Sequence, residues 1–374
     1  MKNLFFLITM CCVVISCSRK KPDGSMPETK NITNEDFKEH RLAYEVLPIE
    51  MTDFVWTMSM LDTLAFFLSE GGEDLVPIYD LKNNRRVGGV IKKGLGPTEM
   101  THSSTRVQIN AVKGFAAIYD GQQKLFMAFP LDVLTRLAAG DTNRAFTPFV
   151  KFYSEKFNFD ISALDTNVFA GLAHPQPVME TQSLIYSDRR ITFYDRQGKV
   201  TAEKGGYYRT PEIKLPEEMN FAAFSGRIIN RDDGERIVIP NEDTDRIEIY
   251  DGQGNIIRLI KGPDYFNPDV VDVSKGNMIG YLPGEKSRTA YAFPVAKKSG
   301  FWAIYYGLSH KELEGRSEDS PTTILSFDWD GNPLDKYIIP ADVRFFDVDE
   351  SRGLLYGMMM TEEGEQKIIK AKYR

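Results

Sequence analysis

The sequence predicts an all-β protein, a six-bladed β-propeller that is closed by a strand from its own N-terminus. Three observations lead to this prediction. From about Leu42 onward, short apolar runs rich in Val, Ile, Phe and Tyr are separated by Gly, Asn, Asp and Pro, which is typical of strands joined by turns. One hairpin turn recurs five times in register, and the last repeated unit lacks a strand that the N-terminal region can supply.

The recurring turn follows an aromatic-Asp pair at the end of an apolar strand. Asp caps such a turn by accepting backbone N–H bonds, and Gly or Asn supplies the positive φ that reverses the chain. We expect each turn to join the third and the outer strand of a four-stranded unit. The copies are Tyr79-Asp80 with Asn83-Asn84, Tyr119-Asp120 with Gln123-Lys124, Tyr194-Asp195 with Gly198-Lys199, Tyr250-Asp251 with Gly254-Asn255, and Phe327-Asp328 with Gly331-Asn332.

The final unit contains three strands, at Val343–Val348, Leu354–Met360 and Gln366–Tyr373. Ala43–Ile49 can supply its outer strand, because a ring closed in this way has no exposed sheet edges. The propeller is therefore expected over residues 41–374. A pair of β-sandwiches is the alternative, although a sandwich gives no reason for one turn to recur in register.

Helices are expected at two places only. Leu131–Ala139 carries three leucines at helical spacing between a proline and a glycine, which predicts a helix inserted between strands. Asn34–Arg41 is a second, shorter candidate that leads into the domain.

The first residues have the pattern of an export signal. After a short positive start, Leu4–Ile15 is almost entirely apolar, but it is shorter than the ~20 residues that span a bilayer. The following Val14-Ile15-Ser16-Cys17 resembles the lipobox of bacterial lipoproteins. The resemblance implies a signal peptide over residues 1–16, acyl chains such as palmitate on Cys17, and a polar tether over 17–40. An ordinary signal peptide with incidental cysteines is the alternative.

The predicted export signal determines which cysteines the exported chain keeps and where in the cell the protein is located. All three cysteines lie at or before Cys17, so the exported chain would carry no disulfide, no cysteine metal ligand and no thiol nucleophile. By the same resemblance, the non-acidic Ser18 favours the outer membrane of the cell envelope. The formal charge of −7, without a long basic run, argues against a nucleic-acid partner.

The sequence favours a binding protein over an enzyme. It contains no Gly-x-Ser-x-Gly and no His-Glu-x-x-His motif, and its four histidines, His40, His102, His174 and His310, are far apart. Asp328–Asn332 is similar to the start of a calcium loop, but Ile339 stands where the bidentate Glu belongs, and the repeated turn explains the segment better. We therefore expect no catalytic residue, no metal ligand and no cofactor.

A further motif, Gly94-Leu95-Gly96-Pro97-Thr98-Glu99, follows the outer strand of the first unit. Together with the lipobox and the repeated turns, it resembles the TolB-like and NHL-like six-bladed propeller lipoproteins of Gram-negative bacteria. The resemblance implies the fold more than an activity. Because six-bladed propellers include calcium-dependent hydrolases and lactonases, whose metal is held near the central channel, an enzyme of that class is the alternative function.

Propellers usually bind ligands on the face that carries the second-to-third and blade-to-blade connections. The expected second-to-third loops are strongly acidic: Ser69–Asp74, Pro175–Gln182, Asn241–Asp245, Gly307–Pro321 and Thr361–Glu365. Blade-to-blade loops begin with a repeated Lys-Gly, and two continue into paired aromatics. These features predict a protein, peptide or glycan partner. The candidate binding residues are Lys93, Gly94, Gly96, Pro97, Glu99, Tyr207, Tyr208, Arg209, Tyr265 and Phe266. The alternative is that the acidic loops are solvated tips and the aromatics pack between blades.

Overall fold

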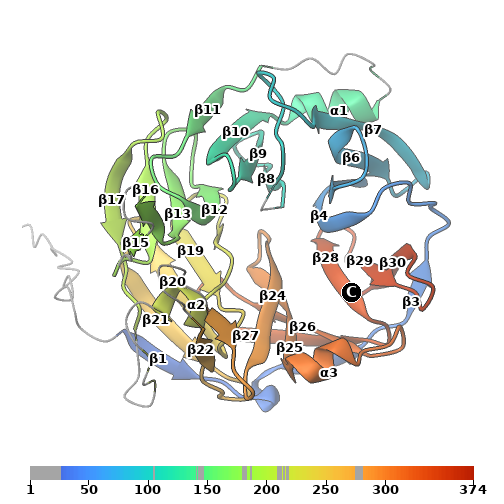
Figure 1. Ribbon diagram of the computed structural model, residues 1–374. Helices are drawn as coiled ribbons and strands as arrows, with labels where there is room; N and C mark the ends of the chain where they lie inside the picture. Colours follow the sequence, from blue (N-terminus) through green and yellow to red (C-terminus); the bar gives the residue numbers. More distant parts are fainter. Residues whose placement is uncertain are drawn as a thin grey trace, which may run out of the picture.

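The computed structural model describes residues 27–103, 106–139, 141, 147–178, 183–185, 188–208, 213, 215, 219–273 and 281–374. They form six blades arranged as a ring, each built on four antiparallel strands (Figure 1). The prediction of an all-β six-bladed propeller is confirmed. The expected signal peptide, Cys17 and Arg209 lie outside the described residues. No helix in the described part of the chain is long and apolar enough to cross a membrane.

Each blade uses its first strand as the innermost one. Blade 1 is β4 (Val55–Leu61), β5 (Leu64–Ser69), β6 (Asp74–Asp80) and β7 (Arg85–Lys92); blade 2 is β8 (Gln108–Asn110), β9 (Phe115–Asp120), β10 (Leu125–Pro130) and β11 (Val150–Tyr153); blade 3 is β12 (Asn158–Ala163), β13 (Phe169–Ala173), β16 (Ile191–Tyr194) and β17 (Val200–Lys204). Blade 4 is β18 (Ile229–Asn230), β19 (Arg236–Pro240), β20 (Arg246–Asp251) and β21 (Ile256–Lys261); blade 5 is β24 (Arg288–Ala296), β25 (Phe301–Ser309), β26 (Thr322–Phe327) and β27 (Pro333–Ile339); blade 6 is β28 (Val343–Asp349), β29 (Leu354–Met360), β30 (Gln366–Lys372) and β3 (Tyr44–Val46).

This topology gives the ring two different faces. We call the face with the first-to-second and third-to-outer connections the turn face, and the face with the second-to-third and blade-to-blade connections the loop face. Most insertions lie on the loop face: the hairpins β14 (Gln176–Val178)–β15 (Ser183–Ile185) and β22 (Val270–Asp272)–β23 (Tyr281–Pro283), and the helices α2 (Asn220–Ala223) and α3 (His310–Glu314). Apolar side chains form six cores, one at each junction between neighbouring blades.

The repeated turns have the predicted chemistry. In each turn the Asp Oδ1 accepts backbone N–H bonds, from Lys82 and Asn83, from Gln123, from Gln197 and Lys199, from Gln253 and Asn255, and from Asp330 and Asn332. The residues with positive φ are Asn84, Lys124, Gly198, Gly254 and Gly331.

One of the five turns does not join the predicted strands. Tyr119-Asp120 ends β9, so this turn joins the second and third strands of blade 2 and lies on the loop face. The third-to-outer connection of blade 2 instead carries α1 (Asp132–Ala138), the helix predicted over Leu131–Ala139. Asp-capped turns close any two-stranded hairpin, so the local sequence did not distinguish the two positions.

Closure by the N-terminal region is confirmed, because β3 pairs antiparallel with β30 as the outer strand of blade 6. The same region does more than the sequence predicted. Before β3, the strand β1 (Glu28–Asn31) pairs in parallel with β21, and β2 (Lys38–Arg41) pairs in parallel with β27. The helix expected over Asn34–Arg41 is limited to a 3-10 turn, Asn34–Asp36. Part of the expected tether therefore forms a belt, residues 28–46, along the outer edges of blades 4, 5 and 6.

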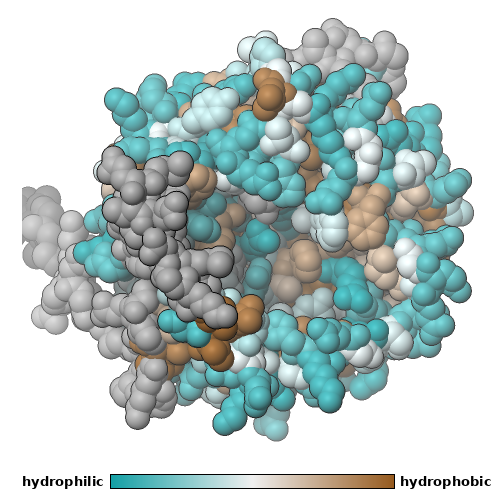
Figure 2. Space-filling model, in the orientation of Figure 1, coloured by the Kyte–Doolittle hydropathy of each residue, from teal (hydrophilic) through white to brown (hydrophobic). Residues whose placement is uncertain are grey.

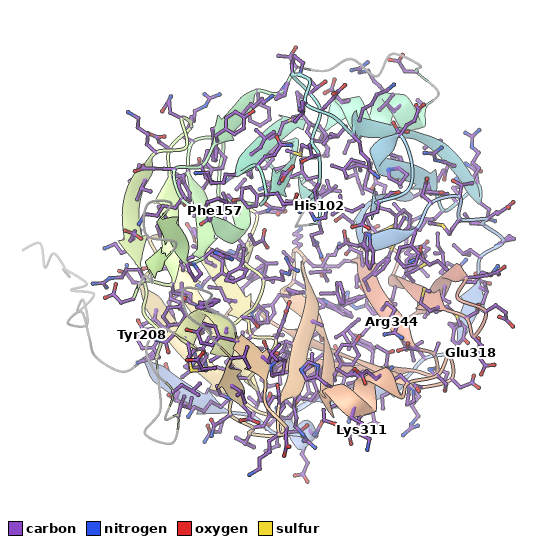
Figure 3. The ribbon with its side chains drawn as sticks, in the orientation of Figure 1. His102, Phe157, Tyr208, Lys311, Glu318 and Arg344 are labelled. Carbon is purple, nitrogen blue, oxygen red and sulfur yellow. The ribbon has the colours of Figure 1, made fainter. Side chains whose placement is uncertain are left out.

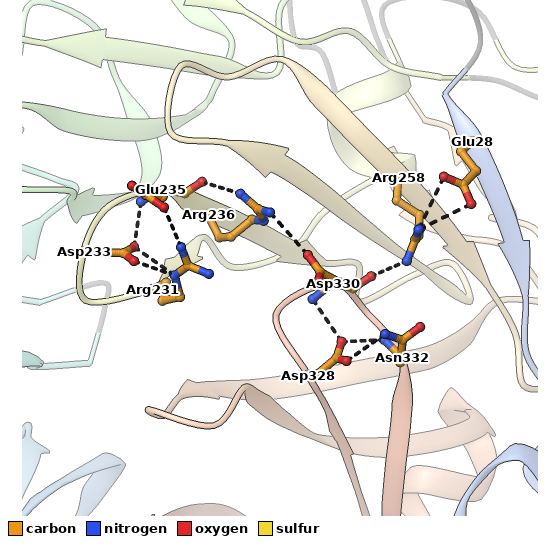
Figure 4. A network of polar contacts seen from close by, with 9 residues as sticks. All are labelled: Glu28, Arg231, Asp233, Glu235, Arg236, Arg258, Asp328, Asp330 and Asn332. Atoms are coloured by element: carbon orange, nitrogen blue, oxygen red, sulfur yellow. Dashed lines mark hydrogen bonds and ion pairs between the residues drawn. The ribbon is translucent and has the colours of Figure 1, made fainter. Parts of the chain in front are cut away.

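Polar contacts fix the start of this belt to the turn face (Figure 4). Arg258 of β21 bonds both carboxylate oxygens of Glu28 at 3.3 Å and donates to the carbonyl oxygen of Asp330 at 2.6 Å. Lys30 donates to Oδ1 of Asn332 at 2.7 Å. Since Asp330 and Asn332 belong to the third-to-outer turn of blade 5, the belt enters the ring from the turn face.

Candidate functional site

Four predicted acidic loops connect second to third strands and lie on the loop face as expected: Ser69–Asp74, Asn241–Asp245, Gly307–Pro321 and Thr361–Glu365. Part of the fifth, Pro175–Gln182, lies outside the described residues. Several of their carboxylates are engaged within the protein: Asp74 is buried beside Arg86, Glu242 lies 3.5 Å from Arg227, and Glu365 pairs with Lys367 at 2.7 Å. In Figure 3, Glu318 of one acidic loop and Tyr208 of an aromatic loop lie on opposite sides of the ring. Another acidic loop, Asn241–Asp245, does adjoin an aromatic loop, because Asp245 Oδ2 accepts from the Tyr265 N–H at 2.7 Å. The acidic loops are therefore spread around the ring, and only some of them lie beside the aromatic loops.

The paired aromatics lie in separate junctions between blades. Tyr207 is half-buried below the guanidinium of Arg190, 5.2 Å from its ring centre, and Tyr208 packs against the core between blades 3 and 4. Phe266 is half-buried against the core between blades 4 and 5, whereas the neighbouring Tyr265 is 46% exposed. Three of the four rings thus contribute to packing.

The Gly-x-Gly-Pro-x-Glu motif forms a compact loop between blades 1 and 2. The Glu99 carboxylate folds back and accepts the Gly96 N–H at 2.8 Å, and a Cβ at Gly94 would lie 2.0 Å from the same carboxylate. Lys151 of β11 holds the loop through the carbonyl oxygen of Pro97 at 2.6 Å, and Lys93 donates to the carbonyl oxygen of Glu70. These contacts explain the glycines and the glutamate by local structure.

A cavity of about 100 Å³ lies at the centre of the ring. Figure 2, which shows the loop face, has a hollow at this position with both hydrophilic and apolar side chains around it. All six blades contribute inner-strand residues to the cavity: Thr57, Gln108, Asp160, Asn230, Phe293 and Phe345.

The polar wall of the cavity is built around Asp160, which is 5% exposed. Burial raises the pKa of its carboxyl to about 6, although Arg227 and Arg106 act in the opposite direction. Burial also lowers the pKa of Arg106, whose Nη1 donates to the carbonyl oxygen of Pro294 at 2.9 Å. Asp160 Oδ1 has no hydrogen-bond partner among the described residues.

A second atom of the cavity is also buried without a hydrogen-bond partner. Thr57 Oγ1, from blade 1, is buried and likewise has no partner within the described part of the chain. The nearby amide groups are engaged: Gln108 Oε1 accepts from Ala163 N at 3.0 Å, and Asn230 Oδ1 accepts from Ser162. Because buried polar atoms almost always have partners, two such atoms in one cavity require an explanation.

The apolar wall lies on the blade 5 and blade 6 side. Phe293 is 36% exposed, and its ring centre is 6.0 Å from that of the buried Phe345. Phe293 also has a φ of 48°, a left-handed conformation that a bulky residue rarely adopts, at an irregularity in the pairing of β24 with β25. Beside Thr57, Trp56 is 47% exposed and meets the ring of Phe54 edge-on at 4.7 Å.

The histidines are not gathered at this cavity. His40 bonds Asp335 at 2.8 Å on the ring's outer edge, and His174 lies 4.4 Å from the ring of Phe159. Among the described residues, no group of three or more His, Cys, Asp or Glu side chains is placed to hold a metal ion.

Thr57, Arg106, Asp160, Arg227 and Phe293 are not among the binding residues predicted from the sequence. A signal was present in β12, where Asp160 and Ser162 alternate with apolar residues, as they would on a strand with one polar side. The binding residues predicted from the sequence lie in loops, whereas the cavity residues lie mainly on inner strands.

Comparison with known proteins agrees with this architecture. Residues 171–351 match the family model described as TolB-like 6-blade propeller-like. This match spans just under half of the chain, and the structure shows that the chain has the six-bladed propeller fold that the family description names. No curated protein sequence matches it.

Two crystal structures resemble this propeller over nearly its full length. A protein of Bacteroides fragilis NCTC 9343 described as exported has a TM-score of 0.53 and 11% identity, and the match covers 92% of this chain and 100% of that one. A member of the DUF4221 family from Bacteroides vulgatus ATCC 8482 has a TM-score of 0.51 and 9% identity, with 89% and 97% covered. At these identities the likeness shows the fold alone.

Proposed function

We propose that this propeller is a non-enzymatic binding module of the cell envelope, and that it holds its partner at the loop-face mouth of the central cavity. The observation that supports this most directly is that two buried atoms of one cavity, Thr57 Oγ1 and Asp160 Oδ1, have no hydrogen-bond partner among the residues that the structure describes. A few convergent polar groups beside an apolar wall are the usual composition of a ligand site.

The envelope location rests on the lipobox at Cys17 and is consistent with a structural neighbour that is described as exported. The position of the belt indicates which face of the ring would lie toward the membrane. Ten residues separate Cys17 from Pro27, a reach of at most about 36 Å, and the belt starts on the turn face. An anchor at Cys17 would therefore hold the turn face toward the membrane and leave the loop face open to a partner.

Site-specific photo-crosslinking in intact envelopes tests the binding surface. Trp56 lies at the loop-face end of β4 and is 47% exposed; Val112 lies in a turn-face connection and is 76% exposed, which makes it a matched control position. We expect crosslinks from position 56 that disappear in Asp160→Asn, and none from position 112. Crosslinks from 112 alone, or crosslinks from 56 that Asp160→Asn leaves unchanged, would contradict the proposal.

The anchor is tested separately by Cys17→Ser. The variant is expected to leave the membrane fraction while it retains its fold. Persistence in the membrane fraction would contradict lipid anchoring but not the binding site.

A further inference from the structure

We propose that the ligand of the central cavity is a neutral saccharide, whose hydroxyl-bearing edge enters between Thr57 and Asp160 while its apolar ring face lies against the phenylalanines. This inference rests on the proposed function and specifies the chemistry of the same site.

The charge of the cavity favours a neutral ligand. Among the described residues, the ionisable ones that line it are two arginines and two aspartates, Arg106, Arg227, Asp160 and Asp232, so their formal charges cancel. A cationic group directed at Asp160 would also face both arginines. An anionic group directed at the arginines would face Asp160, and like-charge contacts at a buried site are costly.

The unpartnered atoms favour hydroxyl groups. In its ionised form the Asp160 carboxylate accepts hydrogen bonds and cannot donate them, whereas Thr57 Oγ1 can both donate and accept. A hydroxyl supplies one donor and two acceptor lone pairs, so neighbouring hydroxyls on a sugar ring can donate to Asp160 and accept from Thr57 or a guanidinium. A peptide backbone offers donors and acceptors only at wider, fixed spacing.

The apolar wall suits the other side of a sugar ring. Phe293 is held partly exposed in a conformation that its backbone disfavours, next to the buried ring of Phe345. Flat aromatic rings bury area with little loss of conformational freedom. The space of about 100 Å³ accommodates one edge of a sugar, so the rest of the ligand would remain at the mouth on the loop face.

Thr57→Val is the sharpest test, because it removes a hydroxyl that makes no bond in the described structure and keeps the side-chain shape. We expect saccharide affinity to fall roughly 2- to 13-fold, the equivalent of one neutral hydrogen bond, with thermal stability unchanged or raised. Asp160→Asn is expected to weaken binding about tenfold or more, since it removes a charged acceptor. Thr63→Val, in the β4–β5 turn on the turn face, is the matched control and should bind as the parent does.

The probes separate the effect of ligand charge on affinity from the effect of ligand shape. Methyl glycosides of glucose, galactose and mannose, with N-acetylglucosamine, are the neutral set; glucosamine and glucuronate carry a charge on the same ring; trialanine represents peptides. Binding to the protein purified from envelopes is followed by saturation-transfer NMR and calorimetry. At least one neutral pyranose should bind with a Kd on the order of 1 mM, as expected for a ligand of this size, and tighter than both charged analogues.

Three results would overturn the inference: no neutral saccharide binding at tens of millimolar, equal or tighter binding of a charged sugar or trialanine, or equal affinities for Thr57→Val and Thr63→Val. If position 56 still crosslinks to a partner in an Asp160-dependent way while saccharides fail to bind, the saccharide inference falls and the binding function stands. If saccharides bind but crosslinks come from position 112 alone, the binding surface proposed for the envelope is wrong.

Discussion

Glu248 is the residue whose replacement should destabilise the ring most clearly. It is completely buried in blade 4 and accepts hydrogen bonds from Arg190 of blade 3 at 3.1 Å, from Arg246, and from the hydroxyl of Tyr250 at 2.7 Å. Burial acts to raise the pKa of the Glu248 carboxyl, but the two guanidiniums outweigh it and hold that pKa below its ordinary value. Glu248 is therefore ionised in the folded protein.

Glu248→Gln keeps the side-chain size but leaves two buried guanidiniums without their counter-charge. Breaking a buried ion pair by removing one partner costs about 3–5 kcal/mol. With an unfolding entropy of about 0.7 kcal/mol/K for a domain of this size, the Tm should fall by roughly 4–7 °C. Replacing all three charged residues by apolar residues of similar volume should restore much of this loss, because no uncompensated charge then remains.

Thermal unfolding followed by calorimetry measures the effect. Glu45→Gln provides the control, since Glu45 pairs with Lys370 at the exposed edge of blade 6 and is 59% exposed. Exposed pairs contribute about 0–1 kcal/mol, so this Tm should change by less than about 2 °C. Equal shifts for the two variants would refute the reasoning that the buried charges join blades 3 and 4.

Three further predictions follow from the structure. The Asp160 carboxyl, with its pKa raised by burial to about 6 from an ordinary 3.8, keeps its proton longer in the folded than in the unfolded chain. This group alone should lower stability by up to about 3 kcal/mol as pH rises from about 4 to 6. Burial also raises the pKa of Asp245 to about 6, so unfolding at graded pH should show a smaller decline in Asp160→Asn than in the parent; an equal decline in both would contradict the assignment to Asp160. Gly94→Ala should cost about 1–3 kcal/mol in chemical denaturation, because a Cβ would lie 2.0 Å from the Glu99 carboxylate at a φ of 155°, and a neutral effect would mean that the loop rearranges freely. Single cysteines at Leu282 on the loop face and Val112 on the turn face can be labelled cleanly because the chain has no cysteine after residue 17; in membranes a bulky maleimide should reach position 282 faster, and equal rates would contradict an anchor on the turn face.

Most of the fold could be predicted from the sequence, because strands and turns are specified by patterns of neighbouring residues. Alternating apolar residues specify strands, Asp at the start of a turn specifies where the chain reverses, and the missing strand of the last unit required a partner such as Tyr44–Val46. The same locality explains the error at Asp120. A capped hairpin has the same sequence whether it joins the second and third strands or the third and fourth, so only the position of α1 in blade 2 decided between them.

The belt was missed for a related reason. Residues 28–41 are mostly polar and exposed, and only Ile32 and Phe37 are apolar and buried, so the pattern does not indicate strands. They become ordered because the outer strands of blades 4 and 5 present unpaired backbone groups, which β1 and β2 satisfy by parallel pairing.

What the sequence alone determined is the all-β ring, its repeated turns and its closure, together with the expectation of an anchor at Cys17. What only the tertiary structure decided is the site. Thr57, Asp160 and Phe345 are far apart in the chain and meet because ring closure brings the inner strands of all six blades to one axis. No pattern of neighbouring residues predicts which side chains come together in this way. The burial of Asp160 and the balance of charges in the cavity follow only from the closed ring.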